Sequence, residues 1–151
     1  MFIDYNYYKN TYGGSLTESE FNKQAPKACN YITQQTMTRI TDQSLNSYPP
    51  QIIDTVKRCA CNLTDDYSAI EKARISAMSS GGQISHERAG EVSVTYGSKT
   101  ILSDPTVADE YLLTTLRQYL GLINVNGKIY NLLSKVLIEK DHNCNCCGII
   151  V

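Results

Sequence analysis

The sequence predicts a mainly α fold, a small helical bundle with a protruding β-hairpin loop and a C-terminal arm. Two patterns predict this. Apolar residues recur at steps of three and four, the spacing of a helix with one buried face, in residues 17–37, 51–78 and 107–120. Residues 91–96 alternate instead with a period of two and include β-branched side chains, which is typical of a strand.

These patterns also give the expected domain organisation. A helical domain covers residues 1–127 and carries the hairpin loop at about residues 82–104, and a C-terminal arm covers residues 128–151. A chain of 151 residues has the size of one ordinary domain and buries roughly 70% of its unfolded surface. We expect a single core that contains the following side chains: Phe21, Ile32, Ile53, Val56, Leu112 and Leu116.

The first helix is expected to begin at Thr17, where a hydroxyl and the Glu20 carboxylate three residues later match a capping box. Pro26 interrupts the pattern, so either the helix kinks there or a short first turn precedes the main helix. The apolar residues form one stripe that we expect to be buried: Phe21, Ala25, Ala28, Cys29, Ile32 and Met37.

The second helical pattern covers residues 51–63 and resumes over residues 67–78. Thr64, Asp65 and Asp66 lie between the two parts, and such residues cap or break helices because their side chains bind nearby backbone groups. Residues 41–50 are expected to form a loop, since Ser, Asn and Asp cluster there and two prolines close it.

The period-two segment predicts a hairpin in which residues 97–99 form the turn and residues 100–102 the partner strand. A lone hairpin is marginally stable in water, and a small helical bundle has nothing to cover both its edges. We therefore expect a neighbouring copy to cover it, through a ring interface formed by Val92, Val94 and Tyr96.

Asp104 and Pro105 predict the start of the last core helix, because Asp caps helices and proline suits the first helical position. Gly121 is expected to end it. Asn126-Gly127 is a good tight-turn dipeptide, and the residues after it, 128–140, are ambiguous between a short helix and a strand.

The C-terminal arm ends in apolar residues that no nearby domain can bury, and we expect Ile149, Ile150 and Val151 to bind a partner protein. The arm also holds four possible zinc ligands within six residues: His142, Cys144, Cys146 and Cys147. Zinc sites usually use C-x2-C pairs separated by a folded insert, so an unpaired reduced tail is the favoured interpretation and no metal is expected.

Charge and chemistry exclude several function classes. The formal net charge is −1, without the basic excess of a nucleic-acid binder. No run of apolar residues is long enough to span a bilayer, and Met1 to Asn10 lacks the basic start and apolar core of a signal peptide. We therefore expect a cytosolic protein with six reduced cysteines, no membrane contact and no cofactor.

We expect no enzyme. Ser85, His86 and Glu87 have the residue types of a hydrolase site, but neighbouring side chains cannot converge on one point. Cys59 and Cys61 lie two apart on a predicted helix and face different directions, which favours buried structural thiols. The abundant tyrosines either mark a protein interface or cap a small core with their hydroxyls in water.

Taken in order, a set of fragments over residues 1–123 resembles the head–tail connector (adaptor) proteins of tailed bacteriophages. The sequence departs from that family after Gly121-Leu122, where it continues into a tail of its own. The fragments that carry the resemblance are Tyr8, Tyr12-Gly13-Gly14, Phe21, Ala28-Cys29-Asn30-Tyr31-Ile32, Thr36-Met37-Thr38-Arg39-Ile40, Ile52-Ile53-Asp54-Thr55-Val56-Lys57-Arg58-Cys59-Ala60-Cys61, Ser85-His86-Glu87-Arg88-Ala89-Gly90, Val92-Ser93-Val94-Thr95-Tyr96 and Tyr119-Leu120-Gly121-Leu122.

The resemblance implies a structural virion protein, made in the bacterial host cytoplasm, that forms a twelvefold ring beneath the portal at the head–tail interface. Its expected partners are further copies of itself, the portal protein and a stopper or tail-completion protein, and DNA passes through the ring without specific binding. A near-neutral charge suits a conduit, because a basic lumen would hold the DNA. The alternative is a small helical regulatory or nucleic-acid-binding module.

Overall fold

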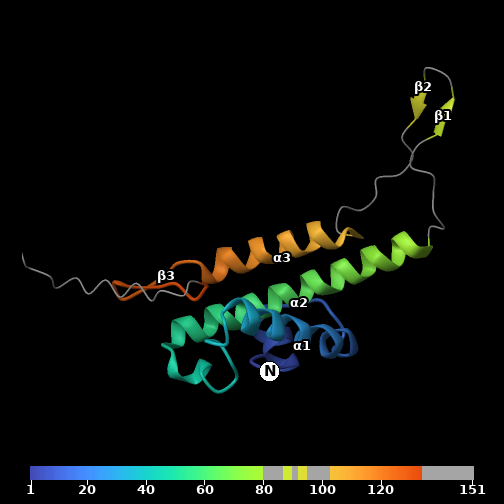
Figure 1. Cartoon of the computed structure of the whole chain (residues 1–151). Helices are drawn as coiled ribbons and strands as arrows, with labels where there is room; N and C mark the ends of the chain where they lie inside the picture. The colour runs from blue at the N-terminus through green and yellow to red at the C-terminus, as the bar shows by residue number, and fades with distance from the viewer. Residues whose placement is uncertain (80–86, 90–91, 95–102, 134–151) are drawn as a thin grey trace, which may run out of the picture.

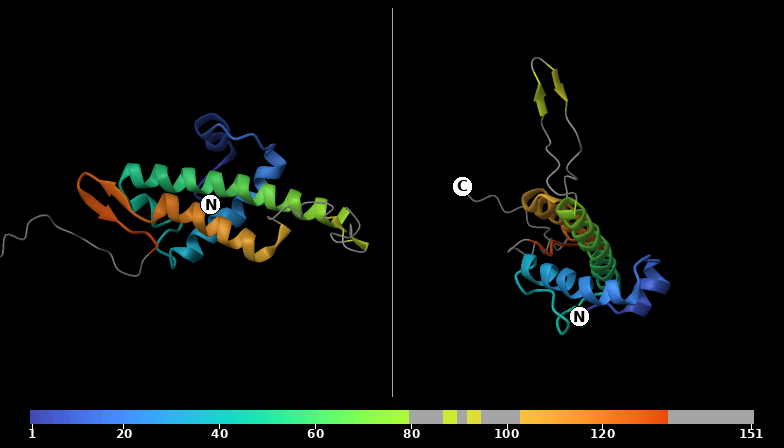
Figure 2. Two further views of the ribbon diagram at one scale, coloured as in Figure 1. Left: turned by 90° about the horizontal axis from the view of Figure 1, so that it is seen from above. Right: turned by 90° about the vertical axis from the view of Figure 1, so that its right-hand side faces the viewer.

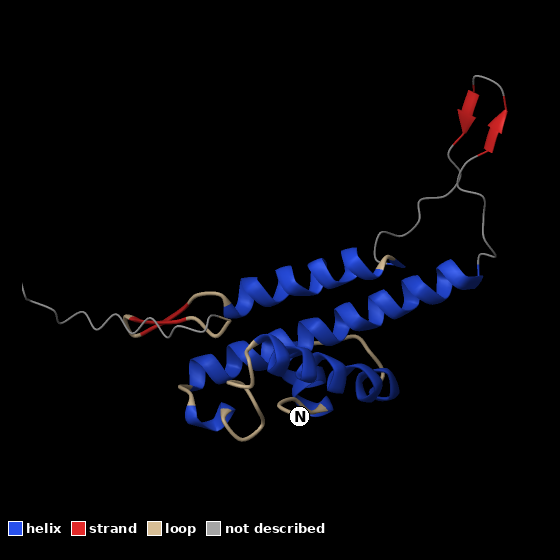
Figure 3. Ribbon diagram, in the orientation of Figure 1, coloured by secondary structure: helices blue, strands red, loops and turns tan. Residues whose placement is uncertain are grey.

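A computed structural model describes residues 1–79, 87–89, 92–94 and 103–133. It confirms the mainly helical fold (Figures 1 and 3). Helix α2 lies between α1 and α3, and both pack against it (Figure 2). The helices are α1 (Glu18–Gln35), α2 (Pro50–Ser79) and α3 (Pro105–Leu120), with two short helices, η1 (Tyr7–Tyr12) and η2 (Leu45–Ser47), and the strands are β1 (Glu87–Ala89), β2 (Val92–Val94), β3 (Ile123–Val125) and β4 (Lys128–Tyr130).

Helix α1 begins with the predicted capping box. The Glu20 backbone N–H donates to the Thr17 hydroxyl at 3.3 Å, and the Thr17 N–H donates to the Glu20 carboxylate at 3.1 Å. Pro26 lies inside this helix, which is continuous, so of the two alternatives for Pro26 the separate first turn is wrong. The predicted stripe is buried apart from Met37, which follows the helix end with a φ of 51° and is half exposed.

Helix α2 is also continuous, and the break predicted at residues 64–66 is wrong. The three polar side chains there bind partners other than the local backbone N–H groups that a cap would use. The Thr64 hydroxyl donates to the Ala60 carbonyl at 2.7 Å, the Asp65 carboxylate accepts from Tyr8, and the Asp66 carboxylate accepts from the Thr115 hydroxyl at 3.2 Å. Tertiary partners therefore satisfy groups that would otherwise favour a helix end.

The core lies where α2 contacts its two neighbours. Five of the six side chains predicted to be inside are buried, and Ile53 is only partly buried because the adjacent Ile52 faces the core instead. The completely buried side chains include Phe21 and Ile32 of α1, Ile52, Val56 and Leu63 of α2, and Leu116 and Leu120 of α3.

Asn126 and Gly127 form the turn of an antiparallel hairpin between β3 and β4, with φ values of 52° and 79°. Residues 128–130, ambiguous in the sequence, are therefore a strand. The Leu132 N–H donates to the Leu120 carbonyl at 3.2 Å, and the Leu132 side chain is buried in the core. The boundary expected between residues 127 and 128 thus falls within the β3–β4 hairpin, and residues 128–133 belong to the folded body.

A second antiparallel hairpin joins β1 to β2, with Glu87 opposite Val94 and Ala89 opposite Val92. The predicted strand is present at its centre, but its partner precedes it in the sequence, whereas residues 100–102 were expected. The expected turn at residues 97–99 and partner at 100–102 lie outside the described residues. In Figure 1 this hairpin stands apart from the three long helices.

Candidate assembly surfaces

The predicted ring-interface residues are only partly placed by the structure. Val92 and Val94 lie in β2, in the connection between α2 and α3. Tyr96 and the predicted partner-binding residues of the arm lie outside the described residues: Ile149, Ile150 and Val151. The described residues nevertheless show two further apolar surfaces, which the sequence analysis missed.

The first surface is the C-terminal end of α2, residues 74–79, called the α2 tip below. All of its residues are exposed, and Ile75 and Met78 are 58% and 83% exposed. Helix α1 begins beside residue 72 of α2, where Lys72 pairs with Glu20 at 3.1 Å. The tip therefore extends beyond the N-terminal end of α1, as Figure 1 shows.

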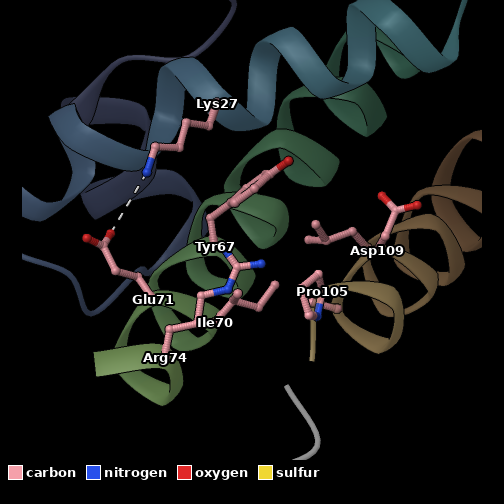
Figure 4. A pocket seen from close by; sticks show the side chains of 9 residues that line it. Lys27, Tyr67, Ile70, Glu71, Arg74, Pro105 and Asp109 are labelled. Atoms are coloured by element: carbon pink, nitrogen blue, oxygen red, sulfur yellow. Dashed lines mark ion pairs between the residues drawn. The ribbon is translucent and has the colours of Figure 1, made fainter. Parts of the chain in front are cut away.

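A pocket of about 570 Å³ adjoins this tip and is called the three-helix pocket (Figure 4). Its floor is apolar, formed by Ile70, Ala108 and Leu112, which are buried. Tyr67, Pro105 and charged groups from all three long helices surround the floor. The charged residues of the rim are Lys27, Glu71, Arg74 and Asp109.

Both carboxylates of this rim already have donors. Glu71 accepts from Lys23 and Gln24, and the Lys27 ammonium lies 3.9 Å from it, so these hydrogen bonds and charges lower the pKa of Glu71. Asp109 accepts from the Tyr31 hydroxyl at 3.4 Å, and burial together with the Asp109 charge raises the pKa of Tyr31 to about 12.

The second surface lies at the opposite end of α3, on the β3–β4 hairpin. Leu122 is 72% exposed and Ile129 is also exposed. A groove of about 620 Å³ runs beside Leu122, lined further by Arg117, Gln118, Gly121, Asn131 and Leu133. This end and the α2 tip are therefore two different apolar surfaces on one body.

Two tyrosines of the N-terminal segment bind carboxylates of α2, an arrangement that the sequence analysis did not expect. Tyr8 is completely buried, and its hydroxyl donates to Asp65 and accepts from the Leu16 N–H at 3.1 Å. Burial and the Asp65 hydrogen bond raise the pKa of Tyr8 to about 12. The Tyr7 hydroxyl donates to Asp54 at 2.7 Å. These bonds fix the N-terminal segment on α2.

A sequence signal for this contact existed. Asp54 and Asp65 are eleven residues apart, which is close to three turns, so both lie on the same face of α2. Acidic residues repeating along one face of a largely apolar helix need donors, and the tyrosine-rich N-terminus supplies them.

The cysteines of the described residues are buried free thiols: Cys29, Cys59 and Cys61. Burial raises the pKa of all three, to about 12 for Cys61, so the reactive thiolate is scarce at neutral pH. Residues 1–79 and 103–133 hold no cluster of three or more metal-ligating side chains, whereas His142, Cys144, Cys146 and Cys147 lie outside the described part.

Within the part of the chain that the structure describes, no helix is both long and apolar enough to cross a bilayer. Comparison with known protein families, with curated protein sequences and with solved structures finds no match for this chain. The resemblance to connector proteins therefore rests on the residues quoted for it above.

Proposed function

We propose that this chain is a structural assembly protein, a head–tail connector that forms a ring beneath the portal of a tailed bacteriophage and lets DNA pass. One observation carries the proposal: two different apolar surfaces lie at opposite ends of the body, the α2 tip and the β3–β4 hairpin. A ring needs a heterologous contact, in which one surface of each copy binds a different surface of the next.

The exposed side chains fit this role. Large apolar side chains on a surface mark protein contacts when they gather in one place. Ile75 and Met78 lie three residues apart, on one side of the α2 tip, and the hairpin of β1 and β2 follows this tip in the chain. The hairpin belongs to the segment that we expected to contact a neighbouring copy, and the tip directly precedes that segment in the chain.

The experiment is to measure the size of the purified chain by sedimentation and to image it by electron microscopy. We expect closed rings. Val94→Asp and Met78→Asp should each give monomers with unchanged helix content, because a charge would be buried in the contact. Asn22→Asp adds the same charge at an exposed position of α1 and serves as the control, which should still form rings.

Rings from the Val94→Asp and Met78→Asp chains would remove this end of the molecule from the contact. A wild-type chain that stays monomeric, alone and with a portal protein, would contradict the connector function. Salt-dependent DNA affinity would favour the alternative of a nucleic-acid-binding module.

A further inference from the structure

Among the described residues, Arg74 is the charged group of the three-helix pocket that has no ion-pair partner. Glu71 forms ion pairs with Lys23 and Lys27. Asp109 accepts a hydrogen bond from the Tyr31 hydroxyl. Within residues 1–79 and 103–133, no carboxylate pairs with Arg74. Figure 4 shows its side chain extending beside Ile70 and Tyr67 toward the middle of the pocket.

This arrangement favours a ligand that has a carboxylate close to an apolar group. A guanidinium binds a carboxylate through paired hydrogen bonds, and these strengthen where water is partly excluded. The floor beside it is apolar, and the pocket volume of about 570 Å³ is in the range that accommodates a small ligand or part of a peptide. The pocket therefore suits a short peptide with an aliphatic side chain close to an acidic one.

The chain itself contains such a peptide. Residues 134–151 include two aliphatic runs, 136–138 and 149–151, and of these only the first is followed by an acidic residue, Glu139. Alternate side chains of an extended peptide point to the same side. Leu137 and Glu139 would then face the pocket together, one toward the apolar floor and one toward Arg74.

Within one copy this peptide reaches only the near edge of its own pocket, and only when the arm is fully extended. The arm leaves the body beside Leu120, whose carbonyl accepts a hydrogen bond from the Leu132 N–H. This point lies at the far end of α3 from the pocket. In the pocket floor, Leu112 lies about 12 Å and Ala108 about 18 Å back along the helix, at roughly 1.5 Å per residue. Leu137 is four residues beyond Leu133 and reaches about 14 Å even when fully extended.

We propose that Leu137 and Glu139 of one copy bind in the three-helix pocket of the next copy, with Glu139 on Arg74. This inference rests on the proposed ring and names the contact that links neighbouring copies. It also accounts for a pocket at one end of α3 and an arm that begins at the other, since a head-to-tail contact joins opposite ends.

A charge swap in the full-length chain tests the contact. Arg74→Glu alone and Glu139→Arg alone each place like charges together, and each should leave folded monomers in sedimentation. An equimolar mixture should recover rings, because the arm of each variant fits the pocket of the other. Lys57→Glu makes the same charge change elsewhere on α2, beside Tyr7, and should form rings by itself.

The outcomes separate this contact from the function on which it rests. Rings from the wild type and from both single variants would overturn the contact and leave the connector function standing. The contact would lie within one chain, and the proposal would also be overturned, if the mixed single variants stay monomeric while a chain that carries both substitutions forms rings. A wild type without rings would overturn both proposals.

Discussion

The two ends of α2 carry similar apolar side chains in opposite surroundings. Residues 52–63 are covered by α1 and α3, and Ile52, Val56 and Leu63 are completely buried. At the α2 tip, Ile75 and Met78 are exposed. The difference does not come from helix propensity, because one continuous helix contains both parts. It arises because α1 and α3 both stop covering α2 before its last turns.

This comparison separates folding from assembly. Side chains at the covered end contribute to the free energy of unfolding of a single copy, because they leave water when the chain folds. Side chains of the tip leave water only if another molecule covers them. Substitutions at the two ends should therefore give opposite results in stability and assembly measurements.

The largest expected effect on stability is at the covered end. Leu63→Ala should lower the free energy of unfolding by about 2 to 5 kcal/mol, because it removes a buried side chain and leaves a cavity in the packed core. Denaturant titration measures this change. A loss below about 1 kcal/mol would mean that α2 is not covered as described.

The contact of the N-terminal segment with α2 should contribute less. Tyr8→Phe removes a hydroxyl and leaves the Asp65 carboxylate and the Leu16 N–H without that partner. We expect a loss of about 1 to 3 kcal/mol, the cost of leaving buried polar groups unsatisfied. Tyr48→Phe, on a partly buried tyrosine, is the control and should lose less. Equal losses would show that the Asp65 contact is unimportant.

Asp66 should make stability depend on pH. Burial raises the pKa of this carboxyl in the folded state above its usual 3.8, so between 3.8 and the raised value the folded chain binds a proton that the unfolded chain does not. Stability relative to an Asp66→Asn variant should therefore increase as the pH falls through that window. Denaturant titrations at several pH values test this, and a difference independent of pH would contradict it.

The smallest effect is expected at the tip. Met78→Ala should change the free energy of unfolding of the monomer by less than about 0.5 kcal/mol, because the side chain is 83% exposed. The same denaturant titration as for Leu63→Ala measures it, at concentrations where the chain is monomeric. A loss comparable to that of Leu63→Ala would mean that the tip is covered within one copy.

The sequence by itself determined the local features. The Thr17 capping box, the Asp104 cap before Pro105 and the Asn126-Gly127 turn depend on atoms a few residues apart, and the structure has all three. The apolar stripe of α1 was predictable for the same reason, since helical periodicity is a short-range property.

Only the tertiary structure decided the rest. Asp65 and Asp66 looked like a helix break, but their carboxylates accept hydrogen bonds from distant donors, the Tyr8 and Thr115 hydroxyls, and the helix stays intact. The partner of β2 turned out to be the preceding segment, because β propensity does not specify which strand pairs with which. The α2 tip and the three-helix pocket depend on where α1 and α3 begin along α2, and no local pattern encodes that position, because packing between distant segments sets it.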